Sequence, residues 1–180
     1  LLPQALVGRQ VLEVRRRGKY LLLDLSEGLL LIHLGISGSL RFVASDELAL
    51  GAAGPHDHFD LQTTRGLLRL HDPRRFGAVI YVPSETDALA RKLLDHLGME
   101  PLEDGFTLQA FREGLAASRA PIKQLLLSGS VVVGVGNIYA SEVLFISRIH
   151  PATPARDIGV RAVRALDGGI RAGLPPAVAT

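Results

Sequence analysis

The first half of the chain alternates short runs of β-type residues with turn signals. Seven runs are predicted to form strands, at residues 10–16, 19–25, 28–34, 39–43, 57–63, 66–71 and 77–82. The turns between them are short, as at Ser26-Glu27-Gly28. Closely spaced strands with short turns indicate an antiparallel sandwich or barrel. The Ala- and Gly-rich stretch from residue 44 to residue 55 is predicted to be an exposed loop.

After about residue 85 the apolar residues recur at helical spacing. The predicted helix starts are, in order, a Ser84–Asp87 capping box, Thr107, Pro121, Asn137 and about Arg156. The first of these helices is predicted to end at Gly98, the third at about Leu127 and the last at about Arg171. Phe106 and Phe111 have the spacing of a hydrophobic staple. The pair Gly168-Gly169 is expected to weaken the last helix.

Strands followed by helices indicate an α+β class with two domains. We place a β-sandwich domain with its closing helix at residues 1–98 and a helical domain at residues 99–180. No apolar run approaches the ~20 residues of a membrane helix, and the start of the chain shows no signal-peptide pattern. The chain has no cysteine, which excludes disulfides and cysteine-ligated zinc. Because no apolar run is long enough to cross a membrane, we expect no membrane association.

The charge pattern points to polyanion binding only locally. The net charge of +2 is a weak argument for nucleic acid, but arginine is clustered at Arg15-Arg16-Arg17 and at Arg74-Arg75. Lys19 follows the first cluster and could bind a phosphate as a point charge. The alternative is an edge strand that its charges protect from aggregation.

The segment Val133-Gly134-Val135-Gly136-Asn137-Ile138 places a glycine turn before a helix. Asn137 is predicted to be the N-cap, and the backbone N–H groups of such a helix start suit a phosphate. The helix that follows is apolar on most sides, so we expect it to be buried. The alternative is an ordinary capped helix after a loop.

Two further turns could meet a nucleic acid. Asp72-Pro73-Arg74-Arg75-Phe76-Gly77 sets two arginines beside one aromatic at a loop tip, where arginine can contact bases and Phe76 can wedge between them. The alternative is that Phe76 packs in the core. In His33-Leu34-Gly35-Ile36-Ser37-Gly38 the glycines would leave Ile36 projecting. His33 could touch a phosphate or could be an ordinary histidine at a strand end.

His56-Asp57-His58 places two histidines on one face of a strand, which is half of a possible metal site. No third ligand follows at a suitable spacing, so we predict no metal site. The chain also has no nucleophile elbow, P-loop or Rossmann glycine pattern.

Taken in order, these segments resemble the formamidopyrimidine-DNA glycosylases. The resemblance covers about residues 10–151 and includes Leu-Gly-Met-Glu-Pro-Leu, Ile-Lys and Val-Gly-Val-Gly-Asn-Ile-Tyr-Ala-Ser-Glu. It implies a β-sandwich, a helix–two-turn–helix domain and a zinc finger, with DNA in the cleft between the domains. It also implies base-excision repair by a bifunctional DNA glycosylase and AP lyase that removes formamidopyrimidine and oxidised guanine from duplex DNA.

The resemblance implies two groups of site residues. The phosphate-binding group consists of Lys19, His33, Asn137 and the backbone amide of Ile138. The void-filling group, which replaces the flipped-out base, consists of Ile36, Arg74 and Phe76. Arg74 would face the orphaned base, and Phe76 would wedge beside it. Lys19 would also be an accessory catalytic residue.

The chain departs from the family pattern at several positions. Ile36 stands where the family usually has Met, and Leu126-Leu127-Ser128-Gly129 replaces Leu-Met-Asp-Gln. The family's catalytic proline and glutamate have no counterpart at Leu1, and Pro3 is expected to be structural. The four-cysteine zinc finger cannot form, so no cofactor is expected in this chain. We expect the chain to lack the N-terminal catalytic segment and the zinc finger, and to bind DNA without catalysis.

Three alternatives remain open. They are a non-catalytic nucleic-acid-binding module, a glycosylase of the sister branch that removes oxidised pyrimidines, and a β-sandwich interaction protein. The turn at residues 72–77 argues against the first alternative. Together with the turn that follows His33, it favours the purine branch over the second. The resemblance implies damaged double-stranded DNA as the partner of a monomeric bacterial protein that is cytoplasmic and nucleoid-associated.

Overall fold

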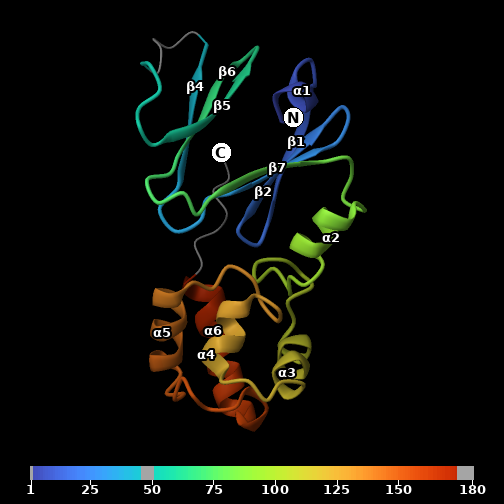
Figure 1. Cartoon of the computed structure of the whole chain (residues 1–180). Coiled ribbons are helices and arrows are strands. Elements are labelled where there is room, and N and C mark those ends of the chain that lie inside the picture. Colours follow the sequence, from blue (N-terminus) through green and yellow to red (C-terminus); the bar gives the residue numbers. More distant parts are fainter. Residues whose placement is uncertain (1, 46–50, 174–180) are drawn as a thin grey trace. The chain divides into compact units, whose positions relative to one another are not determined.

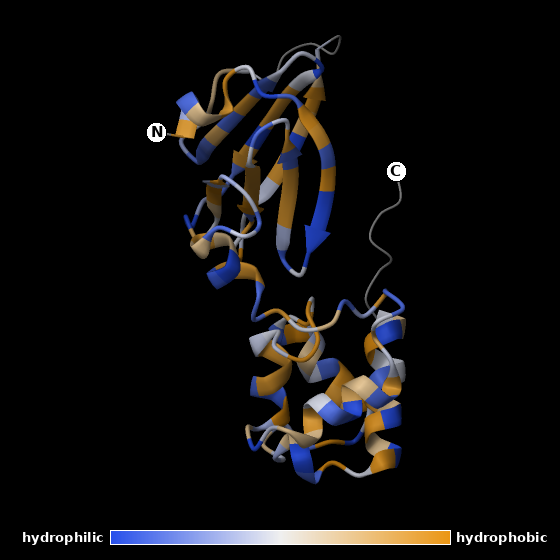
Figure 2. Cartoon of the chain, turned by 90° about the vertical axis from the view of Figure 1, so that its right-hand side faces the viewer, coloured by the Kyte–Doolittle hydropathy of each residue, from blue (hydrophilic) through white to orange (hydrophobic). Residues whose placement is uncertain are grey.

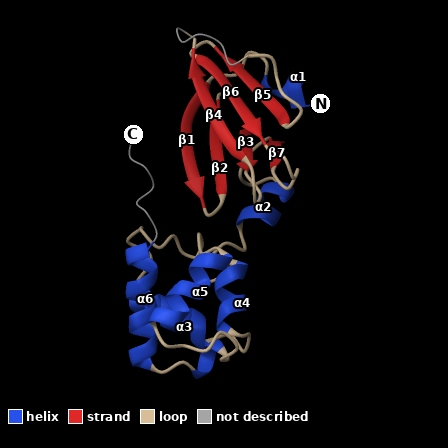
Figure 3. Cartoon of the chain, turned by 90° about the vertical axis from the view of Figure 1, so that its left-hand side faces the viewer, coloured by secondary structure: helices blue, strands red, loops and turns tan. Residues whose placement is uncertain are grey.

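The computed structural model describes residues 2–45 and 51–173. The chain divides into two compact units, Leu1–Ala90 and Arg91–Thr180. The strands lie in the first unit, and helices α3 to α6 lie in the second (Figures 1 and 3). The predicted α+β class, with strands before helices, is confirmed. The finer boundary between residues 98 and 99 stays a prediction.

The first unit is a two-sheet antiparallel sandwich preceded by a short helix. Its elements are α1 (Leu2–Leu6), β1 (Val11–Arg17), β2 (Tyr20–Leu25), β3 (Leu29–His33), β4 (Ser39–Ala44), β5 (Asp57–Thr63), β6 (Gly66–His71) and β7 (Ala78–Val82). One sheet has the order β1-β2-β3-β7 and the other β4-β6-β5. All seven predicted strands are confirmed, each with both ends within one residue of the prediction.

The sandwich closes because the strands place apolar side chains between the sheets. Figure 2 shows hydrophobic and hydrophilic residues interspersed along the strands, as expected where one face is covered. Leu30 and Ile32 of β3 are fully buried and form a cluster with Leu40, Leu61 and Leu68 of the other sheet. β1 lies at the edge of its sheet, where Arg15 makes two hydrogen bonds to Asp24, at 2.6 and 2.9 Å. β1 is therefore a charged edge strand, as one of the two alternatives held, while the phosphate-binding role of Lys19 stays a prediction.

The second unit is helical. Its elements are α3 (Leu108–Ala116), α4 (Ile122–Ser128), α5 (Asn137–Ile146), a 3-10 turn η1 (Ala155–Asp157) and α6 (Val160–Gly173), while α2 (Ala88–Leu94) crosses the division between the units. Thr107 caps α3 by accepting a hydrogen bond from the Ala110 N–H at 3.1 Å, as predicted. The predicted staple is also present, since the buried rings of Phe106 and Phe111 lie 5.2 Å apart. Among the described residues, none of the helices is long and apolar enough to cross a membrane.

Four sequence-based predictions are corrected by the structure. Helix α2 starts one residue after Asp87, whose carboxylate accepts from the Leu89 N–H at 2.9 Å, so Asp87 rather than Ser84 is the capping side chain. The same helix ends at Leu94 and not at Gly98, whose N–H donates to the Gly129 carbonyl instead of to a helix carbonyl. The last helix begins at Val160, after the 3-10 turn. Ala44 belongs to β4, and residues 46–50 of the predicted loop lie outside the described residues.

Helix α5 differs most from its prediction. Gly136, with extended backbone, is its N-cap, and Asn137 is its first helical residue. The helix was expected to be buried on most sides. Val143 and Leu144 are buried, but Ile138 and Phe145 are 76% and 84% exposed. The apolar sequence marks a helix of this unit without revealing which of its faces is covered.

Helices α5 and α6 pack closely through glycine. The Tyr139 hydroxyl donates to the Gly169 carbonyl at 2.5 Å, and a Cβ on Gly169 would lie 2.5 Å from Val143 Cγ2. A Cβ on Gly168 would meet nothing within 4 Å. The glycine pair was predicted only to weaken the helix. Gly169 has a packing role, because a larger residue would not fit against Val143.

Candidate nucleic-acid interface

Two turns of the first unit touch backbone to backbone. The turn after β3 contains Gly35, whose φ is +66°, and the loop between β6 and β7 contains Phe76. A Cβ on Gly35 would lie 2.5 Å from the Phe76 carbonyl carbon and 2.7 Å from Gly77 N. Glycine is needed at this position both for the positive φ and for the close approach. The contact brings together two segments that are about forty residues apart in sequence.

A buried carboxylate lies where the two turns meet. Asp72 is 2% exposed, and its Oδ2 accepts from the Gly77 N–H at 2.7 Å. Its Oδ1 accepts from the Ser37 hydroxyl at 3.2 Å. The Gly77 N–H, together with the Ser37 hydroxyl and the N–H groups of Arg74 and Arg75, holds the pKa of Asp72 below its usual value against the opposing effect of burial. The sequence marked Asp72 only as a turn former and did not suggest its bond to Ser37.

The three residues of the predicted void-filling group project from these turns. Ile36 is 73% exposed and Phe76 is 56% exposed. The guanidinium carbon of Arg74 lies 5.2 Å from the centre of the Phe76 ring, within the range of a cation–π contact. The alternative that Phe76 packs in the core is therefore wrong. We call Ile36, Arg74 and Phe76 the loop tip; its role on DNA stays a prediction.

Lys19 and His33 lie near one another at the same end of the first unit. Tyr20, which follows Lys19, is paired with His33 across β2 and β3, and their rings are 4.9 Å apart. Burial lowers the pKa of His33, and the positive charge of Lys19 lowers it further. Nδ1 of His33 accepts from the Gly35 N–H at 3.0 Å. A neutral imidazole that accepts at Nδ1 carries its proton on Nε2, where it can donate to an anion.

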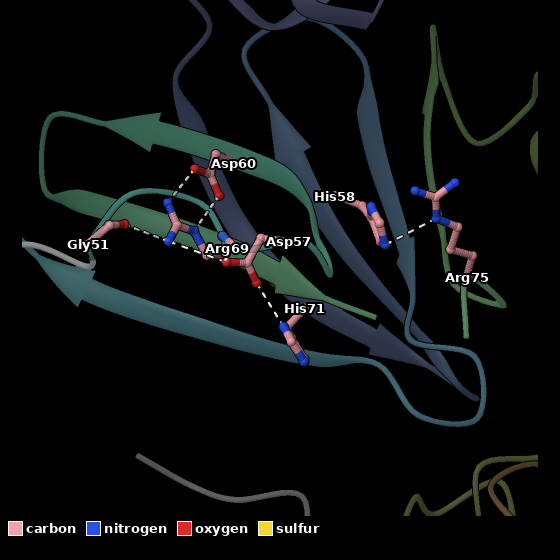
Figure 4. A network of polar contacts seen from close by, with 8 residues as sticks. Gly51, Asp57, His58, Asp60, Arg69, His71 and Arg75 are labelled. Atoms are coloured by element: carbon pink, nitrogen blue, oxygen red, sulfur yellow. Dashed lines mark hydrogen bonds and ion pairs between the residues drawn. The ribbon is translucent and has the colours of Figure 1, made fainter. Parts of the chain in front are cut away.

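Asp57 and His58 of the His56-Asp57-His58 segment have polar side-chain partners within the first unit. Figure 4 shows His71 facing Asp57 and Arg75 reaching His58, with hydrogen bonds of 2.8 and 3.3 Å. Arg75 has a positive φ of 56°, which is strained for a residue with a side chain. Its contact with His58 helps to hold the loop in that conformation.

Next to Asp57, the buried side chain of Arg69 joins β5 and β6. Arg69 makes two hydrogen bonds to its cross-strand partner Asp60, at 2.8 and 2.7 Å, and one to the Gly51 carbonyl (Figure 4). Within residues 2–45 and 51–173, no three His, Asp or Glu side chains are grouped to hold a metal ion. The residues described here do not fit the zinc site that the family resemblance implies.

In the second unit, Asn137 and Ile138 are both exposed in the first turn of α5. The first N–H groups of any helix have no partner within it, so this turn offers donors to an anion. The turn is braced from α4, since Lys123 Nζ donates to Ser141 Oγ at 2.9 Å and Ser141 Oγ donates to the Asn137 carbonyl at 3.0 Å. The sequence did not suggest this bracing, because its partners belong to different helices.

Comparisons with known proteins match both parts of the chain. The sequence profile "Formamidopyrimidine-DNA glycosylase N-terminal domain" matches residues 2–79, and "Formamidopyrimidine-DNA glycosylase H2TH domain" matches residues 97–180. The formamidopyrimidine-DNA glycosylase of Acidovorax ebreus is 62% identical over 98% of this chain and 64% of its own length. The formamidopyrimidine-DNA glycosylase of Bordetella pertussis is 49% identical over 98% of this chain and 63% of its own length. The chain thus spans a little under two thirds of the length of these relatives.

Solved structures are similar as well. The MutM (Fpg) protein of Thermus thermophilus superimposes with a TM-score of 0.79 at 40% identity, covering 92% of this chain and 59% of that one. The Lactococcus lactis formamidopyrimidine-DNA glycosylase, non-covalently bound to DNA with an AP site, superimposes with a TM-score of 0.80 at 30% identity. The match covers 94% of this chain and 64% of that one. A MutM complex with DNA containing carbocyclic 8-oxo-G superimposes with a TM-score of 0.80 at 32% identity, covering 95% of this chain and 64% of that one.

Proposed function

The chain belongs to the formamidopyrimidine-DNA glycosylase family, and we propose that it serves DNA base-excision repair by gripping duplex DNA at an oxidised purine. The observation that supports this most is the loop tip, where two apolar side chains and an arginine are exposed on a tightly braced backbone. A simple phosphate-binding module needs no such tip. The activity proposed for the protein is that of a bifunctional glycosylase and AP lyase acting on formamidopyrimidine and oxidised guanine.

The loop tip acts once the damaged base has left the stack. Flipping a base costs a few kcal/mol, least at a damaged pair, and side chains that fill the void offset part of that cost. Phe76 wedges between the neighbouring bases, and Arg74 donates hydrogen bonds to the orphaned base. Ile36 adds apolar contact in place of the family's usual Met, with a stiffer side chain because it is branched at Cβ.

The phosphate-binding group positions the backbone around the lesion. Lys19 contributes a positive charge, and His33 contributes the outward Nε2–H of its neutral ring. The Asn137 amide and the Ile138 N–H donate from the start of α5. Lys19 also has the proposed accessory role in catalysis. The same proposal places the protein, as a monomer, on bacterial chromosomal DNA in the cytoplasm.

A binding comparison tests this proposal without depending on catalysis. Fluorescence anisotropy would measure the affinity of the protein for three otherwise identical duplexes, which contain oxidised guanine, an oxidised pyrimidine or no damage. We expect the tightest binding to the oxidised-guanine duplex, with affinity falling steeply as salt rises. Preference for the oxidised pyrimidine would favour the sister branch. Equal and salt-independent binding would contradict a DNA-repair role.

A further inference from the structure

We infer that Asp72 is a positioning residue that locks the two turns of the loop tip together, so that Ile36, Arg74 and Phe76 enter DNA as one unit. This inference rests on the proposed function and deepens it. Asp72 does not itself touch DNA in this account. It acts through the residues that do, and it therefore governs lesion recognition more than general DNA affinity.

The carboxylate of Asp72 serves both turns at once. Its Oδ2 holds the Gly77 N–H of its own loop at 2.7 Å, while its Oδ1 holds the Ser37 hydroxyl, next to Ile36, at 3.2 Å. The main chain of Asp72 is fixed as well, since its N–H donates to the His56 carbonyl at 2.8 Å. One buried side chain therefore ties the turn after β3 to the loop between β6 and β7.

The surrounding backbone is packed so that small shifts are not tolerated. A Cβ on Gly77 would lie 2.9 Å from the His33 carbonyl oxygen and 3.0 Å from Asp72 Oδ2. In the same loop, Arg75 is held at a positive φ of 56°. A strained conformation persists only where its surroundings hold it in place. The Arg75 N–H donates to the Asp72 main-chain carbonyl at 3.2 Å, and this bond supplies part of that hold.

The chemistry of the two oxygens explains why an acid is placed here. A carboxylate only accepts hydrogen bonds, and the surrounding groups, a hydroxyl and several backbone N–H groups, can all donate. An asparagine would keep one acceptor, and its NH₂ could donate to the Ser37 oxygen, because a hydroxyl can reverse its role. An alanine would keep neither bond. The expected order of function is therefore aspartate, then asparagine, then alanine.

The decisive variant is Ser37→Ala, because it removes the bond between the turns and leaves the bonds within the Asp72 loop intact. Ser39→Ala is the matched control, since Ser39 is exposed on β4 and is the same residue type two positions away. A duplex with an abasic site opposite 2-aminopurine reports entry of the loop tip as a fluorescence change at saturating protein. Anisotropy on an undamaged duplex reports general affinity.

Ser37→Ala should lower the preference for the abasic duplex by about tenfold, the size expected for a hydrogen bond to a charged acceptor. It should reduce the 2-aminopurine signal at saturation and leave undamaged-duplex affinity unchanged, while Ser39→Ala should match the parent. Asp72→Asn should recover part of what Asp72→Ala loses. If the parent prefers abasic DNA and Ser37→Ala behaves like Ser39→Ala, the inference fails while the proposed function stands. A parent without that preference overturns the proposed function and the inference that rests on it.

Discussion

The main chain of Phe76 occupies the place where a side chain on residue 35 would lie. The distance from that Cβ position to the Phe76 carbonyl carbon is 2.5 Å, well inside van der Waals contact. Because Ile36 follows Gly35 directly, this contact sets the position of one apolar side chain of the loop tip against the other. The backbone contact between these two turns therefore requires that residue 35 has no Cβ.

Gly35→Ala should therefore destabilise the protein for two separate reasons. The positive φ costs a residue with a Cβ about 1–2 kcal/mol, and forcing a methyl group into filled space costs about 1–3 kcal/mol more. Gly8→Ala is the matched control, since Gly8 has a φ of +77° but nothing within 4 Å of its Cβ position. Urea unfolding would measure both variants. Equal losses in free energy of unfolding would show that the contact with Phe76 is not tight.

Neighbouring glycines in α6 should respond in opposite directions to the same substitution. Gly168→Ala should raise the free energy of unfolding by about 1 kcal/mol, because alanine favours a helix and its Cβ position is open. Gly169→Ala should lower it, because the new methyl group meets buried Val143, which is branched at Cβ and cannot turn away freely. Thermal or urea unfolding of the pair checks this. A gain in stability for both variants would contradict the close packing of α5 on α6.

The strands were predictable because their signal is local. Short runs of β-type residues divided by turn signals placed all seven strands, and Thr107 and Pro121 marked the starts of α3 and α4. Gly169 was misjudged because helix propensity says nothing about the Val143 side chain that it faces. The exposure of Ile138 and Phe145 was missed for a related reason, since an apolar run does not reveal which side of a helix has a neighbour.

The candidate site shows the same limit. Its exposed residues lie in short motifs that a sequence displays directly, so Ile36, Arg74 and Phe76 could be named. Their support could not, because Ser37 and Asp72 are 35 positions apart and meet only in the folded sandwich. A bracing contact of this kind has no period or spacing by which a sequence would reveal it.

Replacing Asn137 or Lys19 with alanine should weaken DNA binding in two distinguishable ways. Asn137→Ala should leave the free energy of unfolding within about 0.5 kcal/mol of the parent, because Gly136 rather than Asn137 is the N-cap. It should lower affinity roughly threefold to tenfold, the range of one neutral hydrogen bond, without changing the salt dependence. Lys19→Ala should lower affinity and make the slope of log K against log salt shallower by about 0.9.

Anisotropy titrations at several salt concentrations would measure these slopes. Gln109→Ala is a suitable control, because it also removes an exposed amide in the second unit, where Gln109 bonds only to Glu113 among the described contacts. Should Asn137→Ala bind DNA as well as Gln109→Ala does, the assignment of Asn137 to a phosphate is wrong.

His33 should make stability depend on pH below neutrality. Burial, with the charge of Lys19, lowers its pKa in the folded protein below the ordinary 6.5. Between the two pKa values the unfolded chain binds more protons, so the free energy of unfolding falls as pH drops below about 6.5 and is unaffected by His33 above it. Protonation would also remove the Nδ1 acceptor that holds the Gly35 N–H. Urea unfolding at pH 7.5 and 5.5 should show a smaller difference for His33→Gln; an unchanged difference would contradict the assignment.

The most direct test of the central claim compares two equally exposed phenylalanines. Phe76 and Phe42 are 56% and 54% exposed in the same unit, but only Phe76 belongs to the loop tip. The measurement is the ratio of affinities for an abasic duplex and its undamaged counterpart. Phe76→Ala should reduce that ratio by about tenfold, within the ~1–3 kcal/mol of an aromatic–base stack, with undamaged-duplex affinity nearly unchanged. Phe42→Ala should leave the ratio at the parent value. If the ratio is the same in the parent and both variants, the loop tip does not enter damaged DNA and the account is wrong.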